Sequence, residues 1–395
     1  MTDALPADRP ALLIDLGAVR RNFLIARDTY TGSSLGAVLK KDAYGLGTPR
    51  IAPLLHRLGC RDFWVADLDE AVELRRVLPH GRIFVLHGLA GYSLADFRAV
   101  GAIPVLLDAG EVARAAATVG EARPEVAIQL DTGINRLGLQ LGDVRALAHD
   151  PSPLARLSIA AYVTHLARFA DPAAPQNRWQ WLRFRAWTQS LPPAPLSFCA
   201  SAGTFGPRER HADLARVGSA LYGVETTPSQ PQPIIPAATL SAPILRVHDV
   251  PAGAEVGYGG VYHAPGPRRL AHVAAGYAAG IPFTFRHPWH VLLDGHRVPI
   301  VAGTSMSLMT IDVTDLPAHL AQPGRRVTVF GPDLPVHLLA EAAGVAPNVV
   351  MVAAGRGVRR VYRDPPTAVL VETPPGEMHA PELRDVRIAG AGRDI

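Results

Sequence analysis

Short apolar runs alternate with amphipathic segments along the first 230 residues of the chain. Each run ends in a turn, and the segment after it has apolar residues spaced three and four apart, as in Leu68–Leu78. Buried parallel strands and surface helices show these two patterns. The runs predict strands at Gly36–Lys40, Asp62–Ala66, Arg82–His87, Ile103–Leu107, Val126–Asp131, Ile159–His165, Leu196–Ala200 and Ala215–Gly218. This α/β pattern favours a (β/α)8 barrel of the TIM type, with an open doubly wound sheet as the alternative.

The pattern changes after the Pro-rich segment Thr226–Pro236. Short β-branched runs follow at close intervals with Gly and Pro between them, which indicates antiparallel strands. These runs are Ala242–Val247, Leu270–Ala274, His290–Leu293, Val298–Val301, Thr310–Val313 and Arg326–Phe330. We therefore expect a barrel domain at 10–230 and a mainly antiparallel β domain at 236–364, with residues 1–9 as a candidate addition to the second. The tail at 365–395 is left unassigned.

Composition restricts the class of protein. A chain of 395 residues is long enough to form two hydrophobic cores. Its content of 48% hydrophobic and 19% charged residues excludes a disordered protein. No apolar stretch has the length of a membrane helix, and the first ten residues lack a signal-peptide pattern, so a cytoplasmic location is expected. Cys60 and Cys199 fit a reducing compartment. The net charge of +4 comes from scattered arginines without interleaved aromatics. Neither nucleic acid nor membrane is expected as a partner.

The two lysines of the chain are adjacent, Lys40 and Lys41, although lysine and arginine together number 39. Biased base composition explains the scarcity of lysine but not this position, directly after an apolar run and before a Gly-rich turn. A lysine amine can lose its proton and attack a carbonyl, whereas arginine stays charged. A lysine at the carboxyl end of a barrel strand is therefore a candidate for an imine-forming residue.

Further polar motifs follow other predicted strands. Taken singly, each has an ordinary explanation as a turn, a helix cap, a helix-terminal charge or a buried histidine. Together they bring an anion cradle, a cation, an imidazole and an amine to one face of one barrel. These motifs are Asp131–Gly138, Thr164–Ala167, Ala200–Gly203 and Arg216–Ser219.

The ordered motifs resemble those of the alanine racemases. The segment Ala37–Gly47 is similar to the family's Ala-Val-x-Lys-x-Asx-Ala-Tyr-Gly-x-Gly motif, and four others follow in order: Asp131–Gly138, Thr164–Ala167, Arg216–Gly223 and Val256–Gly259. The resemblance runs from about Arg9 to Tyr362. It implies a fold type III enzyme that uses pyridoxal 5'-phosphate to racemise an amino acid, and a homodimer with shared active sites. No metal is expected.

The resemblance also implies roles for single residues. Lys40 would hold the cofactor through an imine and act as one base, and Tyr258 of the partner subunit would act on the other face, since inversion at Cα requires two faces. Arg216 would face the pyridine nitrogen, and His165 would contact Arg216 and relay protons toward Tyr258. The implied catalytic residues are Lys40, Tyr258, His165 and Arg136; the cofactor-binding residues Lys40, Tyr44, His165, Ser201, Arg216, Gly218, Ser219 and Tyr362; and the substrate-binding residues Arg136, Tyr277 and Met306.

The chain departs from the family's pattern next to Asp131. Gln129 stands where the family has a lysine, two residues before that aspartate. A carboxamide can accept a hydrogen bond from Arg136 but brings no negative charge. We therefore expect Arg136 to be less firmly neutralised and freer to meet an anionic group.

Other departures remove charge from the second domain. The segments Gly303–Leu308, Gly276–Gly280 and Ile281–Phe285 lack arginines and acids of the family, and a phosphate-contacting tyrosine is replaced within Ala354–Gly357. These changes favour a neutral substrate larger or less polar than alanine, with alanine itself as the other option. A decarboxylase on the same scaffold would need an acid or cysteine to reprotonate Cα, and no clear candidate is present. A non-catalytic carrier of pyridoxal phosphate would need neither the second domain nor Tyr258.

Overall fold

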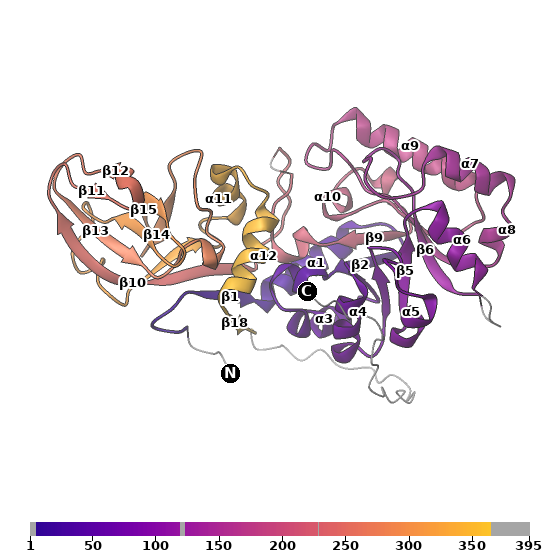
Figure 1. Ribbon diagram of the computed structural model, residues 1–395, viewed down its shortest axis with the longest axis horizontal. Helices are drawn as coiled ribbons and strands as arrows, with labels where there is room; N and C mark the ends of the chain where they lie inside the picture. The colour runs from indigo at the N-terminus through magenta and orange to yellow at the C-terminus, as the bar shows by residue number, and fades with distance from the viewer. Residues whose placement is uncertain (1–4, 119–122, 228, 365–395) are drawn as a thin grey trace, which may run out of the picture. The chain divides into compact units, whose positions relative to one another are not determined.

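The computed structural model describes residues 5–118, 123–227 and 229–364, so the tail at 365–395 lies outside the described residues. Eight parallel strands form one sheet in the order β8-β7-β6-β5-β4-β3-β2-β9 (Figure 1). A parallel bridge between Ala200 and Arg216 joins its two ends. The predicted (β/α)8 barrel is thereby confirmed. Its strands are β2 (Ser34–Val38), β3 (Asp62–Val65), β4 (Arg82–Val85), β5 (Ala102–Leu106), β6 (Glu125–Gln129), β7 (Ser158–Val163), β8 (Leu196–Ser197) and β9 (Leu214–Val217).

The barrel interior is filled by large side chains. Trp64 and Phe84 stack with their ring centroids 4.1 Å apart. Gly36 on β2 allows this close packing, because a Cβ there would lie 2.8 Å from the indole nitrogen of Trp64. The free cysteines, Cys60 and Cys199, are both buried. The side chains of the apolar runs thus form a packed hydrophobic core inside the barrel. In barrels of this type the functional site lies at the carboxyl ends of the strands.

Helices connect the barrel strands, and several begin at a side chain that caps the first helical turn. Asp67 and Asp108 each accept a hydrogen bond from the backbone N–H three residues on, and Ser93 does the same. These caps stabilise the strand-to-helix turns. The helices are α1 (Leu16–Thr29), α2 (Lys40–Tyr44), α3 (Thr48–Arg57), α4 (Leu68–Val77), α5 (Leu94–Val100), α6 (Ala109–Ala117), α7 (Leu141–His149), α8 (Ser152–Ala155), α9 (Pro175–Gln189) and α10 (Ser201–Thr204).

The backbone around Lys40 differs from the extended strand that the sequence predicts. β2 ends at Val38, and Lys41 to Tyr44 follow in a left-handed turn with φ between 52° and 58°. Such a conformation costs about 1–2 kcal/mol per non-glycine residue. The Asp42 carboxylate, which accepts from Thr48 N at 2.6 Å and pairs with Arg360, stabilises the turn. Lys40 therefore lies between the end of β2 and this turn, and not on the strand itself.

The second part of the chain is an antiparallel sheet, as predicted, with the order β13-β16-β15-β14-β17-β10-β1-β18. One neighbouring pair, β1 with β18, is parallel. β1 lies in this sheet beside β10, whereas the sequence pattern predicts that residues 10–230 belong to the barrel domain. The strands are β1 (Ala11–Asp15), β10 (Ala238–Val250), β13 (Arg268–Val273), β14 (His290–Leu293), β15 (His296–Thr304), β16 (Met309–Asp312), β17 (Arg326–Phe330) and β18 (Arg359–Arg363), with β11 (Glu255–Val256) and β12 (Tyr262–His263) as a separate pair.

Two helices that the sequence pattern did not indicate precede β18: α11 (Val336–Ala343) and α12 (Pro347–Gly357). α12 contacts the turn after Lys40, since a Cβ on Gly45 would lie 2.9 Å from the Met351 carbonyl oxygen. Within the described ranges, no single helix has the length and apolarity to cross a membrane, and α11 with α12 would meet both criteria only as a pair bent by 108°.

Candidate functional site

A cavity of about 410 Å³ opens at the carboxyl ends of the barrel strands. Most residues that the sequence singled out line it together, as expected from the convergence of strand ends. They are Lys40, Tyr44, Arg136, His165, Ser201, Arg216, Gly218 and Ser219, and the wall also contains Val38, Leu86, His87, Leu107, Gln129, Leu137, Leu166, Phe169, Ala200, Ala202, Gly203, Thr226 and Asn348.

Lys40 is a half-buried amine on the cavity wall. Its burial, and next the positive charge of Arg136, lower its pKa below the ordinary value of 10.5. Lys41 and Arg216 act in the same direction, and Glu70 opposes them. A lowered pKa increases the neutral fraction of the amine, which is the nucleophilic form. Lys40 thus has the chemistry of an imine-forming lysine.

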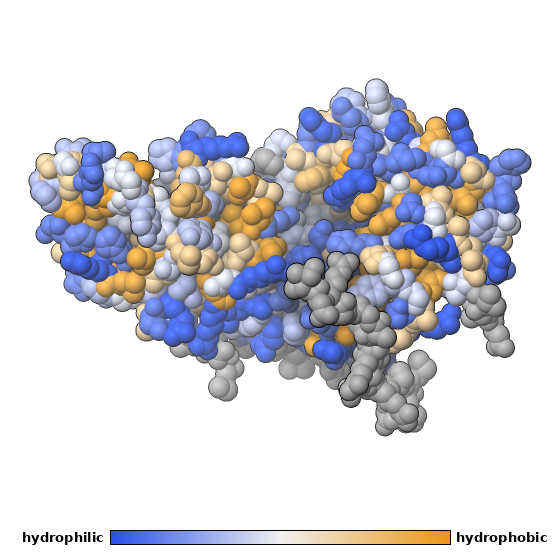
Figure 2. Space-filling model, in the orientation of Figure 1, coloured by the Kyte–Doolittle hydropathy of each residue, from blue (hydrophilic) through white to orange (hydrophobic). Residues whose placement is uncertain are grey.

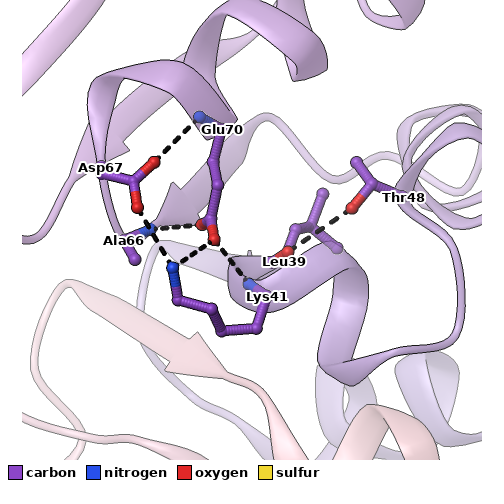
Figure 3. Close-up of polar contacts among 6 residues, drawn as sticks. All are labelled: Leu39, Lys41, Thr48, Ala66, Asp67 and Glu70. Carbon is purple, nitrogen blue, oxygen red and sulfur yellow. Dashed lines mark hydrogen bonds and ion pairs between the residues drawn. The ribbon is translucent and has the colours of Figure 1, made fainter. Parts of the chain in front are cut away.

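Lys41 has the opposite environment (Figure 3). Its ammonium lies 2.8 Å from a Glu70 carboxylate oxygen and 3.1 Å from one of Asp67. Glu70 also accepts hydrogen bonds from the backbone N–H groups of Lys41 and Ala66, so the carboxylate is fixed in place. The hydrogen bond to Glu70 raises the pKa of Lys41, and burial opposes it only in part. Lys41 is therefore held as a cation outside the cavity wall.

Arg216 is buried at the base of the cavity. Its two terminal nitrogens donate to the backbone oxygens of Ser197, at 2.8 Å, and Thr164, at 2.5 Å. Its guanidinium carbon lies 5.6 Å from the centre of the Trp64 ring. Burial lowers the pKa of Arg216 to about 10, so the group remains a cation at neutral pH. Its Nε has no hydrogen-bond partner among the described residues and is left for a ligand.

Arg136 is carried by a loop that Asp131 organises. The Asp131 carboxylate accepts hydrogen bonds from the backbone N–H groups of Gly133, Asn135 and Arg136 at 2.9–3.0 Å. Burial alone would raise the pKa of Asp131, but these bonds lower it overall. Gln129 lines the same cavity, yet within the part of the chain that the structure describes its side chain makes no hydrogen bond to Arg136. The expected acceptor role of Gln129 is thus not seen.

His165 lies on the cavity wall with Arg216 and Lys40. Burial, followed by the charges of Arg216, Arg136 and Lys40, lowers its pKa to about 3. The imidazole is therefore neutral at physiological pH. No hydrogen bond joins it to Arg216 among residues 5–118, 123–227 and 229–364, so the predicted contact is one of proximity.

Hydroxyl and amide groups gather at another part of the wall. The Ser201 hydroxyl accepts from Gly218 N at 2.9 Å. A Cβ on Gly218 would lie 2.5 Å from the Tyr44 hydroxyl, so only glycine allows this approach. Burial raises the pKa of Tyr44 to about 12, which keeps the phenol a hydrogen-bond donor. Asn348 of α12 joins the group through a 3.2 Å bond from its Nδ2 to the Ser219 hydroxyl.

Four of the predicted residues lie off the cavity wall within one chain. Tyr258 is 85% exposed, and Tyr277 and Met306 are also exposed. Tyr362 is half-buried on β18 and donates to the Leu46 carbonyl oxygen at 3.0 Å. Tyr362 therefore supports the Gly-rich turn after Lys40 and does not take the predicted place beside the cavity.

Two family models match nearly all of this architecture. The model described as "Alanine racemase, N-terminal domain" matches residues 14–226, and "Alanine racemase, C-terminal domain" matches residues 237–362. The chain belongs to the alanine racemase family. Its alanine racemase relatives include a protein of Acidiphilium cryptum, 38% identical over 90% of this chain and 99% of that protein. A catabolic alanine racemase of Agrobacterium fabrum is 36% identical over 90% of this chain and 92% of the other.

A solved alanine racemase has the same fold. The crystal structure from Bartonella henselae, which has covalently bound pyridoxal phosphate, superposes with a TM-score of 0.86 at 30% identity. The match covers 90% of this chain and 99% of that one. The likeness therefore extends over both parts of the alanine racemase architecture.

The sequence reasoning missed several wall residues of this alanine racemase family member. Asn348 could not be predicted as a wall residue because it lies on α12, a helix that the sequence pattern did not indicate. The Ala346-Pro347-Asn348 step before an apolar helical run was the available signal, since Pro favours the first helical turn. Leu137 lies within the Asp131–Gly138 motif and Phe169 follows the Thr164–Ala167 motif, so their position after strands β6 and β7 was a second signal.

Proposed function

We propose that the protein is a pyridoxal 5'-phosphate-dependent racemase of alanine or a larger neutral amino acid, with Lys40 and Tyr258 as its two bases. The observation that carries this proposal is the pair of environments at residues 40 and 41. One amine lies on the wall of the cavity with a lowered pKa, and its neighbour is neutralised by Glu70 and Asp67. Membership of the alanine racemase family supports the reaction class.

The residues present fit the cofactor. An aldehyde needs a neutral amine, which Lys40 would supply, and a phosphate needs donors, which the hydroxyl groups of Tyr44, Ser201 and Ser219 would supply. The Gly218 N–H already donates to the Ser201 hydroxyl and so orients it. The absence of a side chain at Gly218 lets the Tyr44 hydroxyl lie against this part of the wall. A volume of about 410 Å³ is within the usual range for small-ligand sites. Pyridoxal phosphate, when bound, supplies the electron-withdrawing ring that acidifies Cα–H.

Arg216 would set the electronic character of that ring. Its free Nε is the group that can donate to a ring nitrogen, and a guanidinium does not give up its proton readily. By donating there, Arg216 would disfavour a proton on that nitrogen and so limit the charge that the ring withdraws and the side reactions that follow. The bonds to Ser197 and Thr164 fix the guanidinium in the required orientation.

Arg136 would bind the carboxylate of the substrate. It is exposed on the cavity wall, and the Asp131 carboxylate is taken up by backbone N–H groups of the loop and by Gln140. With Gln129 uncharged, the position two residues before Asp131 supplies no carboxylate to compete with the substrate for Arg136. Lys40 Nζ, on the cavity wall, would take or return a proton at Cα.

The second base requires a second subunit. Tyr258 is almost fully exposed, and Val261, Met306 and Phe283 of the same part of the chain are exposed as well. Hydrophobic residues also reach the surface of both the sheet part and the barrel part on the face drawn in Figure 2. Such surfaces are typical of oligomer contacts. We infer a homodimer in which Tyr258 of one subunit completes the cavity of the other, with the neutral His165 near the path of its proton.

The alternatives are separated by one assay. A panel of neutral L-amino acids is incubated with the purified holoenzyme, and the D-enantiomer, the amine and CO2 are measured together. The proposal predicts the D-enantiomer without amine or CO2. Amine and CO2 would identify a decarboxylase, and a bound cofactor without any product would identify a carrier. The control is Lys40→Ala, which should form none of these products.

A further inference from the structure

Two large apolar side chains of the cavity wall, Leu137 and Phe169, keep much of their surface exposed. Leu137 is 44% exposed and Phe169 is 41% exposed, and both share the wall with Lys40 and Arg136. Exposed apolar surface of this kind stays hydrated until an apolar group covers it. The amine and carboxylate of an amino acid have their partners in Lys40 and Arg136. The third substituent at Cα is the part of the substrate that these side chains can contact.

Phe169 belongs to the segment after β7 that also carries His165. The centroids of the two rings are 6.5 Å apart, and their planes are inclined by 47°. Because His165 is on the wall beside Lys40, this contact places the phenyl ring next to the reacting part of the cavity. An aromatic ring in that place offers a large apolar surface with little conformational freedom to lose.

The start of this segment is held by Gln180 of α9. The buried Gln180 side chain accepts from Ala167 N at 2.9 Å and donates to the His165 carbonyl oxygen at 2.9 Å. It also donates to the Thr132 hydroxyl at 3.2 Å, which ties the segment to the loop that carries Arg136. The Gln180 amide therefore fixes the backbone on the N-terminal side of Phe169 by hydrogen bonds.

The end of the segment is held by Asn177, one helical turn earlier on α9. The buried Asn177 Nδ2 donates to the carbonyl oxygens of Arg168, at 3.1 Å, and Asp171, at 2.8 Å. Phe169 thus lies between two backbone anchor points that do not involve its own side chain. A contact surface held in this way is preorganised, which reduces the entropy lost on binding.

We propose that Phe169, together with Leu137 beside Arg136, contacts the substrate side chain and makes the enzyme prefer neutral amino acids with a side chain longer than the methyl group of alanine. This inference rests on the proposed racemase function. Each methylene that covers the two residues contributes roughly a fourfold gain in kcat/KM. A charged side chain would lose water against Phe169 without gaining a partner.

The first test is a substrate series: alanine, 2-aminobutyrate, norvaline and norleucine. In the native enzyme kcat/KM should rise along the series. Phe169→Ala should lower the ratio of kcat/KM for norleucine to kcat/KM for alanine by about tenfold or more. The value of kcat/KM for alanine itself should change by less than about threefold. Phe169→Leu retains apolar area and should keep most of the ratio. Trp179→Ala is the matched control, because Trp179 is a 66% exposed aromatic residue of α9 off the cavity wall, and it should change nothing.

The second test measures binding without turnover. Cα-methyl amino acids have no Cα–H and cannot be racemised, so their dissociation constants come from the change in the visible spectrum of the holoenzyme. Phe169→Ala should weaken the binding of a long analogue, 2-methylnorleucine, by about tenfold relative to the binding of 2-aminoisobutyrate. The proposed contact is wrong if Phe169→Ala leaves the preference for the long compound over the short one unchanged in both tests. It is also wrong if that preference increases, because the ring would then exclude long side chains. If the native enzyme racemises none of the amino acids, the proposed function falls, and the binding ratio alone decides on Phe169.

Discussion

The Lys41 ammonium lies 2.8 Å from a Glu70 carboxylate oxygen (Figure 3), whereas the neighbouring Lys40 lines the cavity. Two adjacent amines consequently have different chemistry. Lys40→Ala should abolish the visible absorption band of the holoenzyme, whereas Lys41→Arg should keep it, because arginine still pairs with Glu70 and Asp67. Borohydride reduction followed by peptide mass mapping identifies the modified residue. Cofactor found on Lys41 would move the whole site by one residue.

The pH dependence of cofactor uptake follows from the lowered pKa of Lys40. The neutral amine attacks the aldehyde, so uptake by cofactor-free protein should reach its half-maximal rate below pH 10.5, the ordinary value for lysine. Arg136→Gln removes a nearby positive charge and should shift the profile to higher pH, since the charge had disfavoured protonated Lys40. Arg136→Lys keeps the charge and should leave the profile near that of the native protein. A shift of the glutamine variant to lower pH would contradict this electrostatic account.

Gly218 is required where the wall approaches Tyr44. Gly218→Ala would place a Cβ 2.5 Å from the Tyr44 hydroxyl and 3.3 Å from Val38. Displacement of the tyrosine should weaken pyridoxal phosphate binding by at least about tenfold, or about 1.4 kcal/mol. Fluorescence titration of the cofactor-free protein measures the change. Gly142→Ala is the control, because a Cβ there meets no atom within 4 Å. Equal affinities in the two variants would remove Gly218 from the cofactor site.

The homodimer proposal predicts complementation between two inactive variants. Lys40→Ala lacks one base and Tyr258→Phe lacks the other, so a mixed dimer contains one intact site if Tyr258 acts on its partner. The mixture should recover up to about a quarter of native activity when subunits exchange at random. Differently tagged subunits, purified as the heterodimer, allow the measurement. A heterodimer without activity would show that Tyr258 acts within its own chain or outside the chemistry.

The barrel could be predicted because each of its strands is buried on both faces and therefore reads as an apolar run. The wall residues Lys40, Arg136, His165 and Arg216 could be predicted because strand ends converge in such a barrel. β1 has the same apolar signature as a barrel strand, and only pairing with the distant β10 assigns it to the other sheet. Local pattern carries no information on that pairing.

Two features of the site arise from tertiary contacts that oppose or bypass local preference. The left-handed turn at Lys41–Tyr44 contains no glycine, so propensity argues against it, and Asp42 with Arg360 stabilises it from another strand. Asn348 reaches Ser219 across 129 positions of chain. Neither contact leaves a periodic signal in the sequence.

The central claim, inversion of an amino acid by two bases, is tested most directly by isotope exchange in D2O. Each enantiomer of a neutral substrate is incubated separately with the holoenzyme, and early in the reaction the deuterium content at Cα is measured by NMR after chiral separation. Because one base removes the proton and a different base delivers one from solvent, the product enantiomer should contain deuterium while the recovered substrate keeps its proton. Deuterium appearing equally fast in the recovered substrate, or an amine in place of the opposite enantiomer, would contradict the account.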